Sequence, residues 1–331
     1  MHLKRRDFMT LLGGMAAPIL WPVTAGAQQA KAIRRIGVLM AYAENDAEAQ
    51  SRVVAFRSEL ARLGWIEGKN LMLDIRWSTA DVDKIGSDAQ ALVNAKPDLV
   101  LSSNSPTTVA LLKQTHSIPI IFATVVDPVK SGFVASIARP GGNVTGFTNI
   151  EGSIAGKWLE LVKRIAPAID RVAFLYNPAT APFADIYLKS FEAAAMPLKV
   201  SAIAAPVKEP GEIEAVIAAN APGGLMVMPG PFFANHSEQV IALAARHRMP
   251  AIYPFRYYAE QGGLMAYGSD QADNYRQAAA YADRILRGAS PAELPVVQPT
   301  KFELVVNLRA AKQLGLAPPP TMLAEADQVI E

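Results

Sequence analysis

A run of small polar residues follows one of the apolar segments that we predict to be strands, and it could hold a charged group. Asn104, Ser105 and Thr107 come soon after the segment 98–102, and Pro106 stands between the last two. Pro suits the first turn of a helix and Ser105 suits an N-cap, so we expect a helix to begin here. The free N–H groups of a helix start favour an anion such as a carboxylate. The alternative is that Ser105 only caps its own helix, and the two interpretations are compatible.

Three further polar side chains follow predicted strands. Asp127 precedes Pro128 and could receive an ammonium group, although Asp before Pro also commonly starts a helix. We favour ligand contact because the loop of Asp127 should lie beside that of Asn104. Asn177 is either a turn residue or an amide that reaches a ligand from the opposite side, and the turn is the safer interpretation. Asp270 either faces the same cleft or caps the helix after it.

Aromatic residues cluster near the predicted strand ends. Aromatic walls with a few polar groups are typical of pockets for small ligands. We expect a minority of these residues to touch a ligand, with Tyr42 and Phe232 foremost, and the others to pack the core. Arg256 could pair with a ligand carboxylate, but we give more weight to a tie with an acidic residue of the protein. The aromatic residues are Tyr42, Phe183, Phe232, Phe233, Tyr253, Tyr257 and Tyr258.

The sequence carries no motif for covalent, metal or nucleotide chemistry. It has no G-x-S-x-G elbow, no H-E-x-x-H and no phosphate-binding loop. There is no cysteine, and none of the four histidines stands at metal-ligand spacing from another. We therefore predict no catalytic residue, no metal and no cofactor.

Short β-branched segments alternate with longer amphipathic helices, and these elements must position the loops. Such alternation is typical of parallel sheets covered on both faces, whose ligands bind at the carboxyl ends of the strands. The pattern restarts in the middle of the chain, so we predict an α/β fold of two doubly wound parallel-sheet lobes. The last segments leave no room for a third lobe and should return to complete the first two. The predicted division is 33–146 plus 263–292 for lobe 1, and 147–262 plus 293–320 for lobe 2.

The first 27 residues have the order of an export signal. Arg5 and Arg6 precede Phe8, an apolar run covers 11–23, and Ala25-Gly26-Ala27 offers the small residues that a signal peptidase reads. The arginine pair resembles the twin-arginine signal of bacteria. The apolar run is too short to span a bilayer and contains two prolines. We predict cleavage near Ala27 and a soluble periplasmic protein, since no cysteine follows the signal to carry a lipid.

The charge of the chain argues against a nucleic-acid partner. The formal net charge is +2, and the predicted signal contains three basic residues and one acidic residue, so the mature chain is formally neutral. Nucleic-acid binding would require a basic face. A mature chain of about 300 residues suits two lobes, and we expect it to be a monomer.

Ten short stretches, spread through the mature chain in a fixed order, carry a family resemblance. They are Arg35–Met40, Phe56–Gly68, Ser102–Thr107, Ile118–Val129, Ala138–Phe147, Lys157–Pro167, Val172–Pro178, Gly224–Pro229, Gly262–Gly268 and Pro299–Asn307. Together they resemble the substrate-binding proteins of ABC importers, in the group whose Gram-positive members are associated with tryptophan and related amino-acid uptake. The resemblance implies the type I periplasmic binding-protein fold: two similar lobes, a multi-strand hinge and a ligand held between the lobes. It also implies an ABC permease in the inner membrane as partner.

The resemblance and the aromatic loops together favour a small ligand, either an amino acid or an aromatic carboxylate, that closes the two lobes by hinge bending. A module that presents its ligand to a sensor kinase or chemoreceptor is the alternative. A sugar ranks second to these ligands, because sugar-binding sites usually have more Asp, Asn and Arg residues on the cleft loops than this sequence offers. A periplasmic enzyme on the same scaffold is less favoured because the catalytic motifs are missing.

Overall fold

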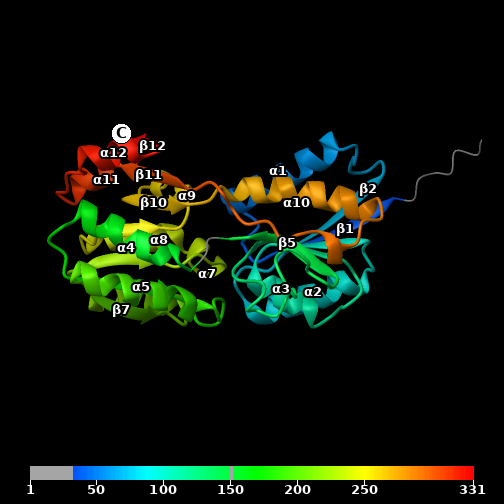
Figure 1. Ribbon diagram of the computed structural model, residues 1–331, viewed down its shortest axis with the longest axis horizontal. Helices are drawn as coiled ribbons and strands as arrows, with labels where there is room; N and C mark the ends of the chain where they lie inside the picture. The colour runs from blue at the N-terminus through cyan, green and yellow to red at the C-terminus, as the bar shows by residue number, and fades with distance from the viewer. Residues whose placement is uncertain (1–32, 150–151) are drawn as a thin grey trace, which may run out of the picture. The chain divides into compact units, whose positions relative to one another are not determined.

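The computed structural model describes residues 33–149 and 152–331, which form two α/β lobes (Figure 1). Each lobe has one mainly parallel sheet with helices on its faces, so the predicted fold class is confirmed. The predicted export signal at 1–27 lies outside the described residues. None of the helices in the described part of the chain has the length and apolar character that crossing a membrane requires.

The first lobe contains a five-stranded sheet in the order β2-β1-β3-β4-β5, and every neighbouring pair is parallel. Strands β3, β4 and β5 are buried along their whole length, as expected for a parallel sheet with both faces covered. The strands are β1 (Arg34–Met40), β2 (Leu71–Trp77), β3 (Leu99–Ser102), β4 (Ile120–Val125) and β5 (Val144–Thr148).

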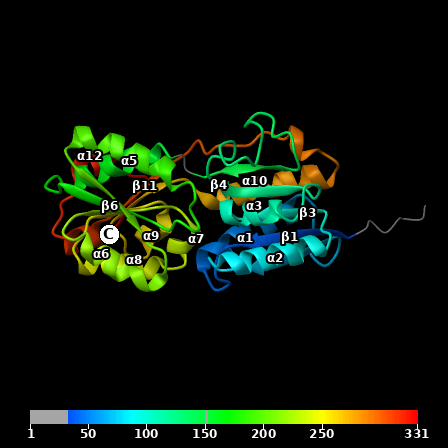
Figure 2. The same cartoon turned by 90° about the horizontal axis from the view of Figure 1, so that it is seen from below.

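Helices cover both faces of this sheet, as Figures 1 and 2 show. One face is covered by α1 and α10, whose Phe56 and Ala278 belong to one buried apolar cluster. The opposite face is covered by α2 and α3, whose Leu92 and Leu111 belong to another. The helices are α1 (Ala47–Arg62), α2 (Val82–Asn94), α3 (Ser105–Leu112) and α10 (Gln271–Leu286), with a short 3₁₀ turn η2 (Pro291–Glu293).

The second lobe contains a seven-stranded sheet in the order β12-β11-β10-β9-β8-β6-β7. Its pairs are parallel except for β10 with β11, which is antiparallel. The strands are β6 (Arg171–Tyr176), β7 (Ser201–Pro206), β8 (Gly224–Val227), β9 (Ala251–Tyr253), β10 (Met265–Gly268), β11 (Glu303–Asn307) and β12 (Gln328–Ile330).

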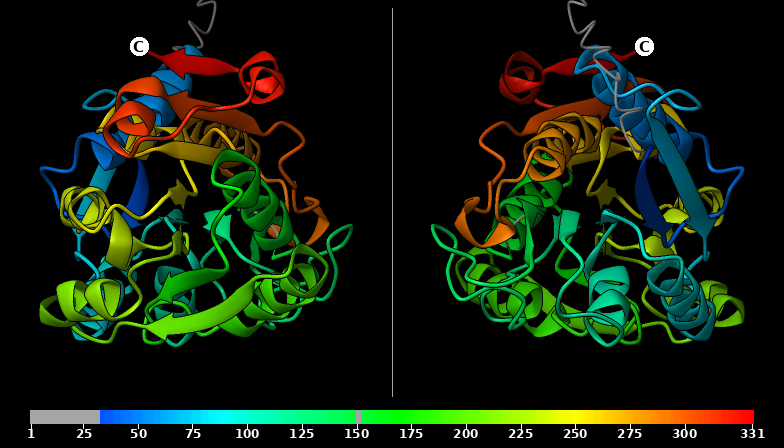
Figure 3. Two further views of the ribbon diagram at one scale, coloured as in Figure 1. Left: turned by 90° about the vertical axis from the view of Figure 1, so that its left-hand side faces the viewer. Right: turned by 90° about the vertical axis from the view of Figure 1, so that its right-hand side faces the viewer.

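The helices of the second lobe surround its sheet, as the end-on views in Figure 3 show. Trp158 of α4 is fully buried against Phe174 and Tyr187, and its indole N–H donates a hydrogen bond to the backbone oxygen of Tyr267 at 2.8 Å. The helices are α4 (Ile154–Ile165), α5 (Ala184–Leu198), η1 (Pro210–Glu212), α6 (Ile213–Ala219), α7 (Pro231–Ala234), α8 (Ser237–Arg246), α9 (Arg256–Glu260), α11 (Leu308–Gln313) and α12 (Pro320–Glu325).

The chain passes between the lobes after β5, after β10 and after η2. We expected lobe 1 to resume at residue 263, but β10 pairs with β9 and β11 in the second sheet, so the chain returns to lobe 1 with α10. The segment after η2 lies along β5, where the N–H of Thr148 donates to the backbone oxygen of Val297 at 2.8 Å. The Nδ2 group of Asn274 donates to the backbone oxygens of Ala123 and Thr148 at 3.0 and 3.1 Å, and this ties α10 to β4 and β5.

Residue 146 must be glycine for β5 to lie against β4. Gly146 has φ +150, and a Cβ placed on it would come within 2.0 Å of the backbone oxygen of Phe122. No side chain fits at that distance, so the close approach of the two backbones depends on this residue.

Candidate functional site

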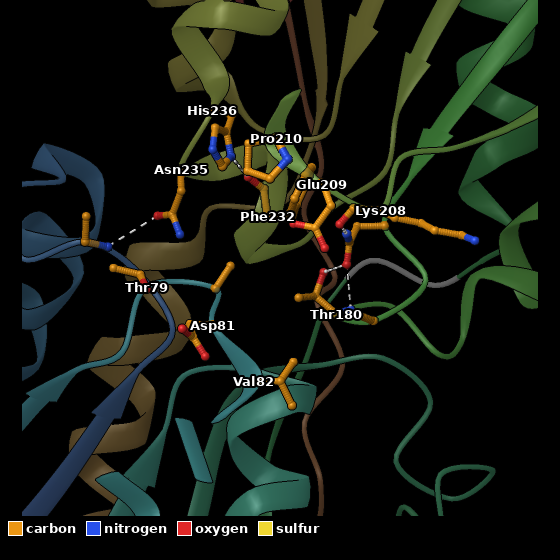
Figure 4. Close-up of a pocket in the computed structure, with 14 residues that line it drawn as sticks. Thr79, Asp81, Val82, Thr180, Lys208, Glu209, Pro210, Phe232, Asn235 and His236 are labelled. Carbon is orange, nitrogen blue, oxygen red and sulfur yellow. Dashed lines mark hydrogen bonds between the residues drawn. The ribbon is translucent and has the colours of Figure 1, made fainter. Parts of the chain in front are cut away.

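Loops from the carboxyl ends of strands in the two lobes line a common cavity of about 560 Å³ (Figure 4). Lobe 1 contributes the segments after β1 and β2, and lobe 2 contributes those after β6, β7 and β8, which is where parallel sheets place ligands. The wall combines apolar groups with the charged side chains of Asp81, Lys208 and Glu209. The lining residues are Ala43, Thr79, Ala80, Asp81, Val82, Asn177, Ala179, Thr180, Lys208, Glu209, Pro210, Phe232, Asn235 and His236.

The two lobes are in direct contact, and two of the contacts are polar bonds between described residues. The backbone N–H of Ala43, after β1, donates to Oδ1 of Asn235 in lobe 2 at 3.3 Å. Lys130 of lobe 1 forms an ion pair with Asp185 of α5 at 3.3 Å, and both side chains are 55% exposed. A smaller cavity of about 260 Å³ lies beside this ion pair. These contacts join the two lobes in the structure.

A capping box holds the loop after β3 at the start of α3. The N-cap is Asn104 rather than Ser105: its Oδ1 accepts a hydrogen bond from the N–H of Thr107 at 3.3 Å, and its own N–H donates to Oγ1 of Thr107 at 3.0 Å. The Ser105 hydroxyl accepts a hydrogen bond from the N–H of Val126 at 3.3 Å. These bonds occupy groups that we expected to face an anion. The Nδ2 group of Asn104 is buried without a partner and remains available as a donor.

Asp127 and Asp270 are exposed, and each accepts hydrogen bonds from its own loop. Oδ1 of Asp127 accepts from the N–H of Lys130 at 3.0 Å, and the residue has a left-handed backbone with φ 39. Oδ1 of Asp270 accepts from the N–H of Ala272 at 2.8 Å as the N-cap of α10, and its other oxygen pairs with Arg276 at 3.0 Å. Asp270 thus has the capping role that we proposed as its alternative. Asp127 also borders a cavity of about 340 Å³ beside the segment after β5.

Asn177 lines the large cavity, but its side chain is engaged within its own lobe. Its Nδ2 donates to the backbone oxygens of Val207 and Lys208 at 2.9 and 3.0 Å. Its Oδ1 accepts from the N–H and the hydroxyl of Thr180 at 2.8 and 2.9 Å. These bonds fix the turn after β6, which is the role that we favoured for this residue.

The aromatic residues fall into two groups. Phe232 lines the large cavity, whereas Tyr42 is buried and lies beneath the guanidinium of Arg52. The second group stacks within lobe 2 and consists of Tyr253, Phe255, Tyr257 and Tyr258.

Arg256 forms ion pairs with Glu260 and Glu303 of its own lobe at 3.0 and 3.2 Å, so its role in the structure is to pair with acidic residues of the protein, which is the interpretation that we favoured.

Five buried polar atoms without a hydrogen-bond partner come from segments where the lobes meet. Within the described residues they are Nε of Arg52, Nδ2 of Asn104, the hydroxyl of Tyr257, Oγ of Ser269 and Oε1 of Gln271. The first two belong to α1 and to the loop before α3, the third belongs to α9, and the last two lie where the chain passes from β10 to α10. Buried polar groups in proteins nearly always have partners. A small polar ligand at the junction would supply them.

Arg52 places a positive charge at this junction. It is 2% exposed, and its guanidinium lies 4.9 Å from the ring centre of Tyr42 in lobe 1 and 5.9 Å from that of Tyr257 in lobe 2. In the described part of the chain no carboxylate comes within ion-pair distance of it. Glu48, one turn earlier on α1, is half-buried, and burial raises the pKa of this carboxyl more than the Arg52 charge lowers it.

A comparison with protein families decides what kind of protein this is. Residues 36–330 match the model of the family described as ABC transporter substrate binding protein. The chain belongs to this family. It is thus the substrate-binding component of an ABC transporter, as the resemblance found in the sequence predicted.

Similar proteins cover most of this binding protein. A tyrosine-binding protein from Clostridioides difficile is 26% identical over 264 residues, which are 79% of this chain and 75% of that one. A solved conserved domain protein from Vibrio cholerae has a TM-score of 0.84 at 26% identity and covers 90% of this chain and 99% of its own. A solved domain from Streptococcus pneumoniae in complex with L-Trp has a TM-score of 0.83 at 25% identity, with the same coverage.

Three of the binding protein's junction residues, Arg52, Ser269 and Gln271, were not predicted from the sequence. Ser269 and Gln271 flank Asp270, whose carboxylate drew attention although it is exposed. Arg52 lies one helical turn before Phe56 on α1, on the side of the helix that is buried. The available signal for Arg52 was a charged residue beside the apolar face of a helix, because charged side chains are almost never fully buried unless they are paired.

Proposed function

We propose that this chain binds an aromatic amino acid between its lobes in the periplasm and presents it to an ABC permease. The observation that carries the proposal is the set of unpartnered buried atoms at the lobe junction. Asn104 Nδ2 is a donor, Gln271 Oε1 is an acceptor and Ser269 Oγ can be either. An amino acid brings an accepting carboxylate and a donating ammonium on one carbon atom, which matches such a mixed set.

The large cavity, whose lining residues are distinct from those that carry the unpartnered atoms, would suit an aromatic side chain. Phe232 lines a cavity of about 560 Å³, a size within the usual range of small-molecule pockets. The similar proteins include one named for tyrosine and one solved with L-Trp. Amino acids with a large ring are therefore the ligands to test first.

Closure of the lobes links binding to delivery. The contacts from Ala43 to Asn235 and from Lys130 to Asp185 join the two lobes. A ligand that contacts both lobes stabilises this closed form over an open one, and a permease can distinguish the two forms. In this proposal the signal at 1–27 exports the protein, and cleavage near Ala27 releases a soluble monomer that carries a ligand and performs no chemistry on it.

The first experiment measures binding directly. The chain from residue 28 onward would be titrated by calorimetry with L-tyrosine, L-tryptophan, L-phenylalanine, L-leucine and glucose. A ligand present at 100 times its Kd should also stabilise the fold by about 2.7 kcal/mol in thermal unfolding. We expect saturable binding of an aromatic amino acid. Binding of glucose alone, or of none of the five, would contradict the proposal.

A matched pair of variants then tests the site. Gln271→Leu removes the unpartnered acceptor, and a lost hydrogen bond to a charged ammonium should weaken binding about tenfold or more. It also removes the Nε2 group that donates to Oδ1 of Asn149 at 3.5 Å, so the ligand-free variant should unfold at nearly the same temperature, with the loss of this long bond offset by the removal of an unpartnered buried oxygen. Gln277→Leu, six residues along the same helix, breaks a bond to Asp273 at 2.7 Å and should leave the Kd unchanged. Equal Kd values for the two variants would remove Gln271 from the site.

A further inference from the structure

Arg52 is a buried charge that the protein itself does not neutralise. It lies on α1 with 2% of its surface exposed, and within the described residues it makes no hydrogen bond and no ion pair. Glu48 is the acidic residue whose charge reaches it, yet no oxygen of Glu48 comes within ion-pair distance. Buried arginines are normally paired, because removing a guanidinium from water is costly.

Two aromatic rings cover the guanidinium but leave its donors unused. Tyr42 and Tyr257 lie 4.9 and 5.9 Å from its central carbon, and the carbon is above the ring face in both cases. Cation–π contacts compensate only part of the cost of burying a charge. The N–H groups of a guanidinium point outward in its own plane and need hydrogen-bond acceptors, which the ring faces do not supply. What fits in that plane is a carboxylate, which can accept two parallel hydrogen bonds.

The surroundings of Arg52 connect it to α10. Arg52 lies over Tyr42, and Tyr42 belongs to the same buried apolar cluster as Tyr275, which is one helical turn beyond Gln271 on α10. Tyr257 comes from lobe 2 and the remaining groups come from lobe 1 or from the segment that joins the lobes. A group held by Arg52 thus stands at the junction, on the side of lobe 1 that α10 covers.

We propose that Arg52 receives the carboxylate of the ligand, between the rings of Tyr42 and Tyr257, so that the site selects organic acids and rejects amines that lack a carboxylate. This inference rests on the proposed function and extends it, since it names the anchoring charge. It also assigns the carboxylate to α1 rather than to the start of α3, where the capping box of Asn104 and Thr107 takes up the donors.

The test compares ligands that differ in one group. L-tyrosine, 3-(4-hydroxyphenyl)propionate and tyramine would be titrated by calorimetry into the wild-type chain, Arg52→Met and Arg52→Lys. L-tryptophan and tryptamine form a second pair. Arg57→Met, on the same helix, is the control: its side chain is 42% exposed and pairs with Glu67 at 3.2 Å.

The expected result is a loss of affinity that is confined to the ligands with a carboxylate. Wild type should bind the carboxylates at least about tenfold tighter than the matching amines, as expected for charged hydrogen bonds. Arg52→Met should remove this preference while binding of tyramine changes little, and Arg57→Met should retain it. Arg52→Lys keeps the positive charge but loses the two parallel N–H donors of the guanidinium, so it should keep part of the preference for carboxylates over amines.

Three outcomes would overturn the inference. Equal weakening of carboxylates and amines by Arg52→Met would make Arg52 a structural contact between the lobes. Tighter binding of amines by wild type would place the ligand charge elsewhere while the proposed function stands. If wild type binds none of the five compounds, the proposed function fails and the inference falls with it. Should Arg52→Met fail to fold, the comparison of Arg52→Lys with wild type decides in the same way.

Discussion

The hydrogen bond between Ala43 and Asn235 should contribute to ligand affinity without contributing to the stability of either lobe. It joins the loop after β1 to the end of α7 at 3.3 Å, and it can exist only when the lobes are closed. Asn235→Ala removes the acceptor. A net hydrogen bond is worth about 0.5–1.5 kcal/mol, and this long, half-buried one belongs in the lower half of that range. The Kd should therefore rise about 2- to 5-fold.

The assay is calorimetry with the tightest aromatic amino acid, together with small-angle scattering to follow closure. Asn220→Ala is the matched control: its Nδ2 donates to the backbone oxygen of Val216 at 2.8 Å within lobe 2, so its loss should lower the unfolding temperature and leave the Kd unchanged. Asp185→Asn breaks the exposed cross-lobe ion pair and should change the Kd by less than about twofold, with a smaller effect at high salt. An unchanged Kd for Asn235→Ala, or an equal rise for Asn220→Ala, would refute the reasoning.

Two further predictions concern stability. Gly146→Ala should cost about 3 kcal/mol or more, or prevent folding, because the new Cβ would stand 2.0 Å from a backbone oxygen of β4; Gly142→Ala, with nothing within 4 Å, is the control in thermal unfolding. Glu48→Gln should raise the unfolding temperature at pH 7. Burial raises the pKa of Glu48 in the folded state, so its ionised form destabilises the fold as pH rises through that pKa. The gain should vanish below the ordinary value of 4.5, and a gain that persists there would show that charge is not the cause.

The local sequence was sufficient to predict the role of a residue where that role depends on residues close to it along the chain. Apolar runs bounded by polar loops predicted the strands and the two lobes, since parallel strands buried on both faces need such runs. Asn177 was predicted to form a turn, and capping was one of the two roles proposed for Asp270. Both roles follow from hydrogen bonds to residues two or three positions along the chain. The N-cap was misplaced by one residue, from Asn104 to Ser105, because several cap-forming residues stand together and only backbone geometry selects among them.

The sequence by itself determined the fold class and the family, because periodicity and turn residues are local properties of the chain. Only the tertiary structure decided which of the polar groups lack partners. Arg52 appears in sequence as one more charge on an amphipathic helix. It becomes a buried and unpaired cation because α9 of the second lobe brings Tyr257 against it while Tyr42 of the first lobe also lies against it. Its place beside the apolar side of α1 indicates burial, but the absence of a partner depends on segments that are distant along the chain and is not recorded by the local pattern.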